Sequence, residues 1–338
     1  MENGRKNSMR QLVRRNFLGG SVAAILALAL AVPGVMSCGG PAQVVPAGSN
    51  FGGVQIGAIS YSFRSLPGGA ENTLQYLLDA GLTSVELMGY TIEAYAGIPE
   101  VNVPMYPRGT ELTPEQQEEV RAARAAQVEA HRNWRLSAPM EKFHELRKMY
   151  NDAGVKIDIA KIGSPNWTDE EIDYAFEVAK ILGARGITTE ISLDAAKKLH
   201  PFAEKHGLYV ILHNHGQPGQ EGFSFDEFLA VGPMIMLNFD VGHYFGATGN
   251  HPNEVIERLH NRIVSLHIKD KTGKYADPAD TNTPWGEGDT PLADILLLLK
   301  ERGWPITCDI ELEYTVPEDS DAVAEVRKCV EYCKAILE

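Results

Sequence analysis

The sequence has few cysteines and no excess of basic residues, and both absences exclude classes of protein. Four cysteines occur in 338 residues, and Cys329 and Cys333 lie one helical turn apart, so no evenly spaced disulfide framework is present. No Cys-x-x-Cys pair occurs, which removes a usual signature of a zinc site. The formal net charge of -14 at pH 7 argues against a nucleic-acid partner, because such binding relies on basic surface.

A dinucleotide-binding motif is also missing. No Gly-x-Gly-x-x-Gly follows the first predicted strand, so a dinucleotide fold loses its best support. What is present is a globular composition, with 44% hydrophobic and 22% charged residues. A chain of this length suits one large domain or two small ones, and single α/β barrels of about 250 residues are common.

Residues 1–38 resemble an export signal and are set apart from the fold. Arg14 and Arg15 precede Phe-Leu and an apolar run over about 20–36, as in Tat signals, which export folded proteins. A single membrane-spanning anchor is the alternative. The run is short for a span, rich in Gly and Ala, and interrupted by Pro33.

The end of this segment resembles a relaxed lipobox. In the run VMSCG, Cys38 would be the lipidated first residue, and ordinary cleavage after a nearby small residue is the alternative. Residues 39–53 are rich in Gly, Pro and Ala, which predicts a flexible linker. We therefore expect an exported protein, either periplasmic or anchored to the membrane through Cys38.

From Val54 the chain alternates strand-like apolar runs with amphipathic helical stretches, the pattern of parallel β/α units. Eight such runs and the helices between them suit a closed barrel better than an open sheet. The sequence thus predicts an α/β fold, a single-domain (β/α)8 TIM barrel over 54–338. Its predicted strands are 54–63, 84–90, 155–163, 186–192, 208–216, 235–243, 263–270 and 306–314.

A long insertion after the second strand interrupts this alternation. About fifty residues separate Tyr90 from Pro139, where a β/α connection normally needs a few. Within it, Thr113 and the residues after it predict a capping box at a helix start, a pattern that recurs at Thr168 and Ser224. A loop after a barrel strand lies at the catalytic mouth, so we interpret the insertion as a lid. A contact between copies in an oligomer is the alternative.

Carboxylates and imidazoles gather at the predicted ends of the last three strands. Asp240 and His243 end the sixth, His267 ends the seventh, and Glu311 and Glu313 share one face at the end of the eighth. Strand interiors favour apolar residues, so strand propensity does not explain why Asp, His and Glu gather at these strand ends. Such side chains bind divalent ions, and a TIM barrel builds its site at this mouth. The sequence predicts one divalent metal ion: Mn, Mg, Co or Zn.

A further ligand is left open by the sequence. Glu190 lies at the end of the fourth strand, and His213 and His215 share a face at the end of the fifth. Either Glu190 or His213 can complete the site.

The motifs DVGHYF and LHIKD and the final ELE strand resemble the xylose-isomerase-like TIM barrels, the sugar phosphate isomerase/epimerase group. The resemblance covers about 54–338. Family members commonly bind one divalent metal through Glu, Asp, His and Glu, which implies Asp240, His267 and Glu311 here. Many members carry Glu-Asn-His on the fifth strand, whereas this chain has His213-Asn214-His215. Such HNHG variants resemble exported members that degrade carbohydrate.

The chemistry implied is proton abstraction from the carbon beside a sugar carbonyl, through a metal-bound enediolate. Return of the proton gives an isomerase or epimerase. Loss of a β-substituent from a keto-sugar, inosose or 3-keto-glycoside gives a lyase or dehydratase. The candidate bases are His213, His215 and Glu313. His243 and Lys269 are expected to contact substrate oxygens, although a surface ion pair with Asp270 is the alternative for Lys269.

Two other classes compete with a carbohydrate enzyme. Endonuclease IV shares this barrel, but it uses three zinc ions and acts on DNA inside the cell, against which the net charge and the leader weigh. A non-catalytic sugar-binding lipoprotein has no need of a metal-ligand set. The expected partners are a small-molecule carbohydrate, no nucleic acid, the membrane only through Cys38, and a second copy in a homo-oligomer.

Overall fold

The computed structural model describes residues 48–107 and 109–338. The predicted signal segment over 1–38, its lipidated Cys38 and most of the predicted linker lie outside the described residues. Within the part that is described, no helix is both long enough and apolar enough to cross a membrane.

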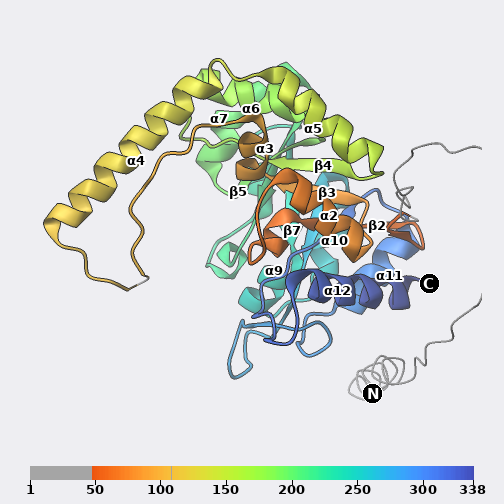
Figure 1. The fold of residues 1–338 in the computed structure, drawn as a ribbon. Helices are drawn as coiled ribbons and strands as arrows, with labels where there is room; N and C mark the ends of the chain where they lie inside the picture. Colours follow the sequence, from red (N-terminus) through yellow and green to blue (C-terminus); the bar gives the residue numbers. More distant parts are fainter. Residues whose placement is uncertain (1–47, 108) are drawn as a thin grey trace, which may run out of the picture. The chain divides into compact units, whose positions relative to one another are not determined.

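Eight parallel strands close into a barrel, as the sequence predicts (Figure 1). Neighbouring strands pair in parallel, and β2 pairs with both β3 and β11, so the sheet closes on itself. Each strand lies inside the run predicted for it. The strands are β2 (Val54–Ile59), β3 (Ser84–Met88), β4 (Lys156–Lys161), β5 (Gly186–Glu190), β6 (Tyr209–His213), β7 (Ile235–Asp240), β8 (Ile263–Ile268) and β11 (Thr307–Ile310).

Helices surround the barrel, and the main core fills the space between them and the outer faces of the strands. A separate small apolar cluster lies among four strands: Ile159, Ile211, Met236 and Val264. The helices are α2 (Ala70–Ala80), α3 (Gly89–Ala96), α4 (Pro114–Arg135), α5 (Met140–Asp152), α6 (Asp169–Leu182), α7 (Leu193–His206), α8 (Phe225–Leu229), α9 (Val241–Thr248), α10 (Asn253–Leu259), α11 (Leu292–Arg302) and α12 (Ala322–Leu337). Short 3-10 helices are η1 (Ser60–Phe63), η2 (Gln217–Gly219) and η3 (His260–Arg262).

Two of the three predicted capping boxes are confirmed. Thr113 caps α4 and Thr168 caps α6, each with the reciprocal bond from the third helical residue. The prediction is wrong at Ser224, whose side chain accepts from the backbone N–H of Asp226 instead. The N–H of Glu227 donates to the Ser224 carbonyl, so it does not serve the side chain.

The folded part begins earlier than predicted. Strand β1 (Asn50–Phe51) pairs antiparallel with the start of β2. Ser49 is fully buried; its hydroxyl donates to the Ile56 carbonyl at 2.6 Å and accepts from the Thr83 N–H at 3.0 Å. The prediction of a flexible linker is therefore wrong for residues 48–53, because these contacts fix them against the barrel.

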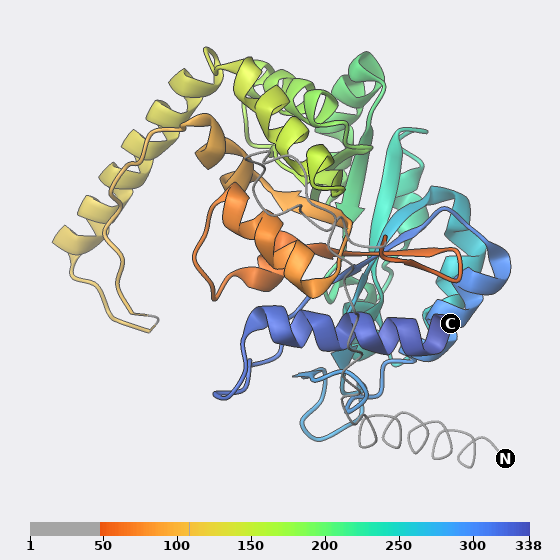
Figure 2. The same ribbon diagram turned by 45° about the vertical axis from the view of Figure 1, so that its right-hand side comes forward.

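The predicted insertion after the second barrel strand is confirmed, and its outer part forms an arm. We call residues 97–135 the arm; it consists of an irregular stretch, 97–113, and α4. Figures 1 and 2 show it projecting away from the barrel rather than lying across it. The base of the arm is held by Arg135, which pairs with Glu93 at 2.7 Å and Glu171 at 3.0 Å. The lid function stays a prediction.

A second irregular stretch follows β8. It contains a small two-stranded sheet, β9 (Asp270–Lys271) with β10 (Asn282–Thr283). This hairpin lies beside the carboxyl end of β8.

Candidate functional site

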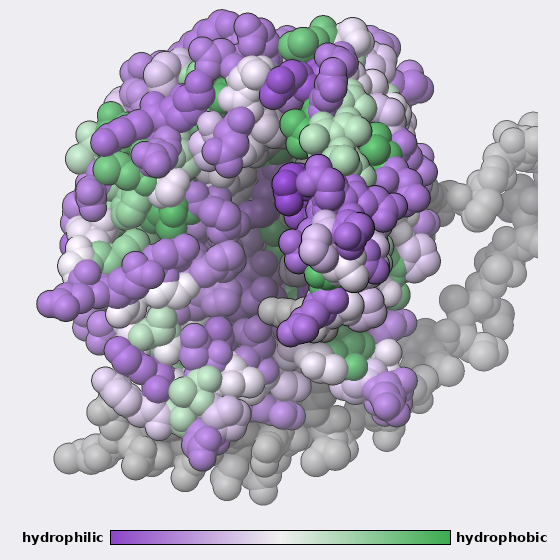
Figure 3. All heavy atoms as spheres, turned by 90° about the vertical axis from the view of Figure 1, so that its left-hand side faces the viewer, coloured by the Kyte–Doolittle hydropathy of each residue, from purple (hydrophilic) through white to green (hydrophobic). Residues whose placement is uncertain are grey.

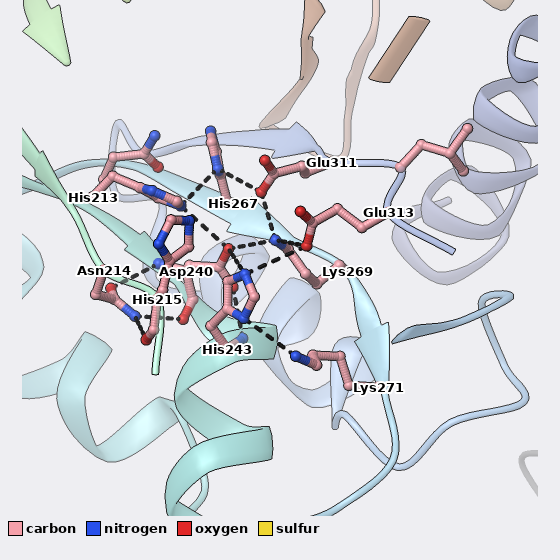
Figure 4. A network of polar contacts seen from close by, with 12 residues as sticks. His213, Asn214, His215, Asp240, His243, His267, Lys269, Lys271, Glu311 and Glu313 are labelled. Atoms are coloured by element: carbon pink, nitrogen blue, oxygen red, sulfur yellow. Dashed lines mark hydrogen bonds and ion pairs between the residues drawn. The ribbon is translucent and has the colours of Figure 1, made fainter. Parts of the chain in front are cut away.

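Four buried side chains that can bind a metal ion converge at the carboxyl ends of the barrel strands. They are His213, Asp240, His267 and Glu311, and one ligand atom of each lies within 4.8 Å of those of the others. His213 ends β6, Asp240 ends β7, His267 lies near the end of β8, and Glu311 follows β11 directly. Figure 4 shows these side chains turned toward one another.

The register of the barrel explains why they meet. Asp240 on β7 lies opposite His267 on β8, and His267 lies opposite Asp309 on β11. Glu311 is two residues beyond Asp309 and so lies on the same inward face. Since neighbouring strands are about 4.8 Å apart, inward side chains at one level of the barrel reach a common point.

Asp240 is held by backbone and amide contacts on two sides. Its N–H donates to Asn214 Oδ1 at 3.0 Å, and Asn214 Nδ2 donates to its carbonyl at 3.2 Å. Its Oδ1 accepts from the His243 N–H at 2.7 Å, which caps α9. One carboxylate oxygen is thus fixed by the helix start, and Oδ2 faces the cluster.

Lys269 places a buried ammonium among three carboxylates. Its Nζ lies 2.8 Å from Asp240 Oδ2, 2.6 Å from Glu311 Oε2 and 2.7 Å from Glu313 Oε2 (Figure 4). Burial would lower the pKa of Lys269, but the three carboxylates raise it above its ordinary value. Lys269 is therefore a fixed cation of the site, only 2% exposed.

The alternative of a surface ion pair between Lys269 and Asp270 is wrong. Asp270 points to the loop after β10, where its carboxylate accepts from the backbone N–H groups of Gly286, Gly288 and Thr290. Successive residues of a strand point to opposite faces, so the two side chains leave the backbone in different directions.

Glu86 on β3 is a buried partner of His267. Its Oε2 accepts from His267 Nε2 at 2.8 Å and from Asn238 Nδ2 at 2.8 Å. His267 Nδ1 then faces Glu311 Oε2 at 2.9 Å and His213 Nε2 at 3.1 Å. A carboxylate on the far nitrogen of an imidazole fixes which nitrogen faces a metal.

The charges of the cluster compensate one another. Burial would raise the pKa of the Asp240 and Glu311 carboxyls, but Lys269 holds both below their ordinary values. Burial would lower the pKa of His267, but Glu311 and Glu86 raise it well above the ordinary value. Each buried carboxylate thus lies beside a cation or an imidazole, as buried charges require, although the carboxylates outnumber the cations.

Glu190 belongs to a neighbouring group rather than to the buried cluster. Its Oε2 lies 3.4 Å from His213 Nδ1 and 3.3 Å from His215 Nδ1, and its Oε1 accepts from Lys161 Nζ at 3.1 Å. The group of Glu190, His213 and His215 also has ligand atoms within 4.8 Å of one another, but Glu190 and His215 are exposed. His213 links the two groups.

Four titratable side chains line the outer edge of the buried cluster. Glu190 contacts His215, the rings of His215 and His243 lie 4.9 Å apart, and His243 Nε2 lies 3.4 Å from Glu313 Oε2. We call Glu190, His215, His243 and Glu313 the rim. All four are at least partly exposed, whereas the four clustered side chains beneath them are buried.

The rim lies on the side of the barrel where the loops after the strands gather. Helices α3 and α9, which follow the carboxyl ends of β3 and β7, lie to the left of these strands in Figure 1. Seen from that side, the molecule is hollowed, and hydrophilic residues surround the hollow (Figure 3).

The buried cluster fits a divalent metal ion by its donor set. Two imidazole nitrogens and two carboxylate oxygens are the ligands that Mn, Co, Zn or Fe take in proteins. The far nitrogen of His267 already carries a carboxylate partner, as metal-bound histidines do. Asp240 is likewise oriented, because its Oδ1 caps α9.

The structure brings together all of the site residues singled out from the sequence. His213, Asp240, His267 and Glu311 form the buried cluster, Lys269 lies among its carboxylates, and the rest form the rim. The sequence reasoning missed Glu86 and Asn238, which lie inside strands. The signal that could have identified Glu86 is its position as a carboxylate between two apolar residues, Val85 and Leu87, in the strand SVELM.

Asp309 is another interior acid that sequence reasoning passed over. It is fully buried, and neither carboxylate oxygen has a hydrogen-bond partner among the described residues. Burial and the nearby Glu86 carboxylate raise the pKa of Asp309 to about 8, so it is protonated at neutral pH. Its Oδ1 lies where a Cβ at Gly57 would stand, so only glycine fits at that point of β2.

Comparison with known proteins gives a family match and several similar solved structures. The family described as xylose isomerase-like TIM barrel matches residues 118–335. No curated protein matches this chain. Because the solved structures are less than 25% identical to it, they show the fold alone.

Three of these structures illustrate the likeness. A sugar phosphate isomerase/epimerase from Parabacteroides distasonis is 19% identical, with a TM-score of 0.53, over 85% of this chain and 96% of that one. The probable 3-DHS dehydratase AsbF from Bacillus anthracis is 14% identical, with a TM-score of 0.56, over 82% and 98%. A xylose isomerase domain protein from Alicyclobacillus acidocaldarius is 15% identical, with a TM-score of 0.55, over 84% and 99%.

Proposed function

This chain belongs to the xylose isomerase-like TIM barrel family, and we propose that it is a divalent-metal-dependent sugar isomerase or epimerase. The observation that carries the proposal is the convergence of two imidazoles and two carboxylates from four neighbouring strands. The reaction removes a proton from the carbon beside a carbonyl and returns it to another carbon or another face. The substrate is a small carbohydrate.

The proposed metal ligands are His213, Asp240, His267 and Glu311. His213 takes the position that the sequence left open, because Glu190 is half exposed and is paired with Lys161 in the neighbouring group. When bound there, a divalent ion polarises the carbonyl oxygen of the sugar and so favours loss of the adjacent proton.

The rim supplies the proposed proton-transfer groups. His215 and Glu313 face the mouth, and each has a polar partner: Glu190 lies 3.3 Å from His215 Nδ1 and His243 lies 3.4 Å from Glu313 Oε2. A base and an acid supported in this way can take a proton and return it. His243 and Lys269 are proposed to contact substrate oxygens, Lys269 as a cation beside developing negative charge.

Metal analysis tests the ligand set. The purified protein, stripped and reloaded with Mn, Zn or Co, is expected to retain one ion per chain. His213→Ala should lower this stoichiometry, whereas Glu190→Ala should leave it near one. A wild type that retains no ion would refute the site, and three zinc ions per chain would favour the endonuclease IV-like alternative.

Turnover in heavy water tests the reaction class. The Mn-loaded protein is incubated in D2O with ketoses, inososes and 3-keto-glycosides, and products are weighed by mass spectrometry. An isomer or epimer carrying one deuterium supports the proposal. A product that has lost water or a glycosyl substituent would assign a dehydratase or lyase instead, and the absence of metal-dependent turnover would favour a binding protein.

Export and lipidation also stand as proposals, because residues 1–38 lie outside the described part of the chain. Replacing Arg14 and Arg15 with Lys should leave the protein in the cytoplasm, and Cys38→Ser should release it from the membrane fraction. Unchanged export of the first variant would refute the Tat interpretation.

A further inference from the structure

The helix of the arm meets the hydrophobic core near its carboxyl end, where Trp134 packs against it. None of the residues Pro114–Arg135, all of them described, is buried. The ordered links to the barrel lie at its end: Arg135 pairs with Glu93 and Glu171, and the Trp134 ring packs edge-on against Tyr174. A helix that is polar on all sides gains little stability from packing, and helical stability in proteins comes mostly from a buried face. Most of the length of α4 therefore lacks the buried face that stabilises such a helix.

One side of α4 is covered by the irregular stretch of the arm. The Gln117 side chain donates to the Leu112 carbonyl at 3.0 Å, and His131 Nε2 lies 3.1 Å from the Pro99 carbonyl. The opposite side is exposed and forms a continuous strip at helical spacing. Within this strip Arg121 pairs with Glu118 at 2.9 Å, and at its barrel end Arg132 lies 3.4 Å from Glu171 of α6. We call this strip the outer face; its members are Glu118, Arg121, Ala122, Ala125, Val128, Glu129 and Arg132, and all are exposed.

The outer face is charge-complementary to itself about Ala125. Glu118 and Arg132 are each seven residues from Ala125 and carry opposite charges. Arg121 and Glu129 are each four residues from it and are again opposite. A two-fold axis at Ala125 therefore places every charge of this face against one of the other sign on an antiparallel copy.

The apolar members of the outer face obey the same symmetry. Ala122 and Val128 are each three residues from Ala125, so each would contact the other across the axis. Ala125 would face itself, and its small side chain lets two helices approach closely at the crossing point. Val128 is 55% exposed, which leaves an apolar side chain in water in the single chain.

We propose that the outer face of α4 is a docking surface for the same face of a second copy of this chain, packed antiparallel in a two-fold dimer. An isologous interface needs a self-complementary surface, and the outer face is one. Exposed ion pairs are individually weak, so they set the register rather than the affinity. One helix pair lies at the small end of known interfaces, so the dimer should dissociate at roughly micromolar concentrations.

The first test is the oligomeric state together with a crosslink at the axis. Full-length protein carrying Cys38→Ser is studied by sedimentation velocity from about 1 to 100 μM, and a concentration-dependent dimer is expected. In the same background, Ala125→Cys should form a covalent dimer under mild oxidation, because a disulfide needs Cα atoms within about 7 Å. Glu119→Cys is the matched control; it is exposed on another side of α4 and should not crosslink.

The second test exchanges charges across the axis. Arg121→Glu alone and Glu129→Arg alone should each weaken the dimer at least several-fold, because each places like charges together. The double variant restores opposite charges and should recover wild-type association. These positions are distant from the proposed metal ligands, so metal stoichiometry should not change.

Three results would overturn the proposal. They are a wild type that stays monomeric throughout the range, an Ala125→Cys variant that crosslinks no faster than the control, and a double charge variant as weak as the single ones. A dimer that Ala125→Glu leaves intact would show that another surface holds the copies together.

Discussion

The two ends of the barrel interior hold buried charges of the same kinds but in different arrangements. At the amino ends of the strands, Asp158 Oδ1 accepts from Lys156 Nζ at 2.6 Å, and its Oδ2 pairs with Arg185 and accepts from Thr307 at 3.1 Å. At the carboxyl ends, Asp240, Glu311 and Glu313 share one ammonium, that of Lys269.

The difference separates structural charges from a binding site. At the amino ends of the strands, each oxygen of the Asp158 carboxylate has its own donor, so neither oxygen is left to bind an added cation. At the mouth more acceptors than fixed cations converge, together with two imidazoles whose nitrogens lie in the same small volume. An excess of ligand atoms over internal partners is what an added cation can satisfy.

The most direct test of this difference is to replace Asp by Asn at each end of the barrel interior, at Asp240 and at Asp158. Asp240→Asn keeps the size and the helix-capping oxygen but removes one anionic ligand. We expect it to abolish tight metal binding and to lower turnover about a thousandfold, roughly 4 kcal/mol of lost transition-state stabilisation. Metal analysis and initial rates measure these effects. Full metal content in this variant would contradict the ligand assignment.

Asp158→Asn at the base should give the opposite result. It leaves Arg185 and Lys156 without a buried carboxylate partner, and breaking a buried pair in this way costs about 3–5 kcal/mol of unfolding free energy. Chemical denaturation with urea measures the loss. Its metal stoichiometry should equal that of the wild type, because no atom of this group lies in the cluster. A variant that loses metal but stays stable would show the two ends to be one functional unit.

The sequence predicted the elements that carry local patterns. The apolar runs gave all eight strands, and the placement of Asp240, His267 and Glu311 at strand ends followed from where those runs stop. Glu86 was missed because its role depends on closure of the barrel: its partner His267 is 181 residues away in the chain. No spacing rule joins residues that meet only across the interior.

The direction of the insertion was equally beyond the sequence. Its length and its capping box at Thr113 were readable, and both are confirmed. Whether such a helix covers the mouth or projects outward depends on the anchors at its end. Those anchors, Glu93 and Glu171, lie 42 and 36 residues from Arg135. An ion pair between separate helices leaves no periodic signal in the sequence.

A smaller effect, on metal affinity, is expected at Glu86, whose carboxylate contacts the Nε2 atom of His267 inside the barrel. Glu86→Gln keeps the shape but weakens the acceptor on His267 Nε2, and losing such a partner typically weakens metal affinity about 10–100-fold. Titration with Co, followed by its visible spectrum, measures affinity without any substrate. Glu93→Gln is the control, because Glu93 is also buried but anchors the arm, and its affinity should not change.

The smallest expected effect is a pH dependence of stability that comes from Asp158, at the amino ends of the strands. Burial would raise the pKa of Asp158, but Arg185 and Lys156 hold it below the ordinary value of 3.8. A carboxyl whose pKa is lower in the folded than in the unfolded chain stabilises the fold above its unfolded pKa. It loses that contribution as the pH falls through the folded pKa, because protons then bind both states.

The gap in melting temperature between wild type and Asp158→Asn should therefore be constant near neutral pH and narrow below about pH 4. Melting curves of both proteins from about pH 7 to about pH 3, with metal removed by a chelator, check this. A gap that stays constant over this whole range would mean that the Asp158 charge is not what stabilises the base of the barrel.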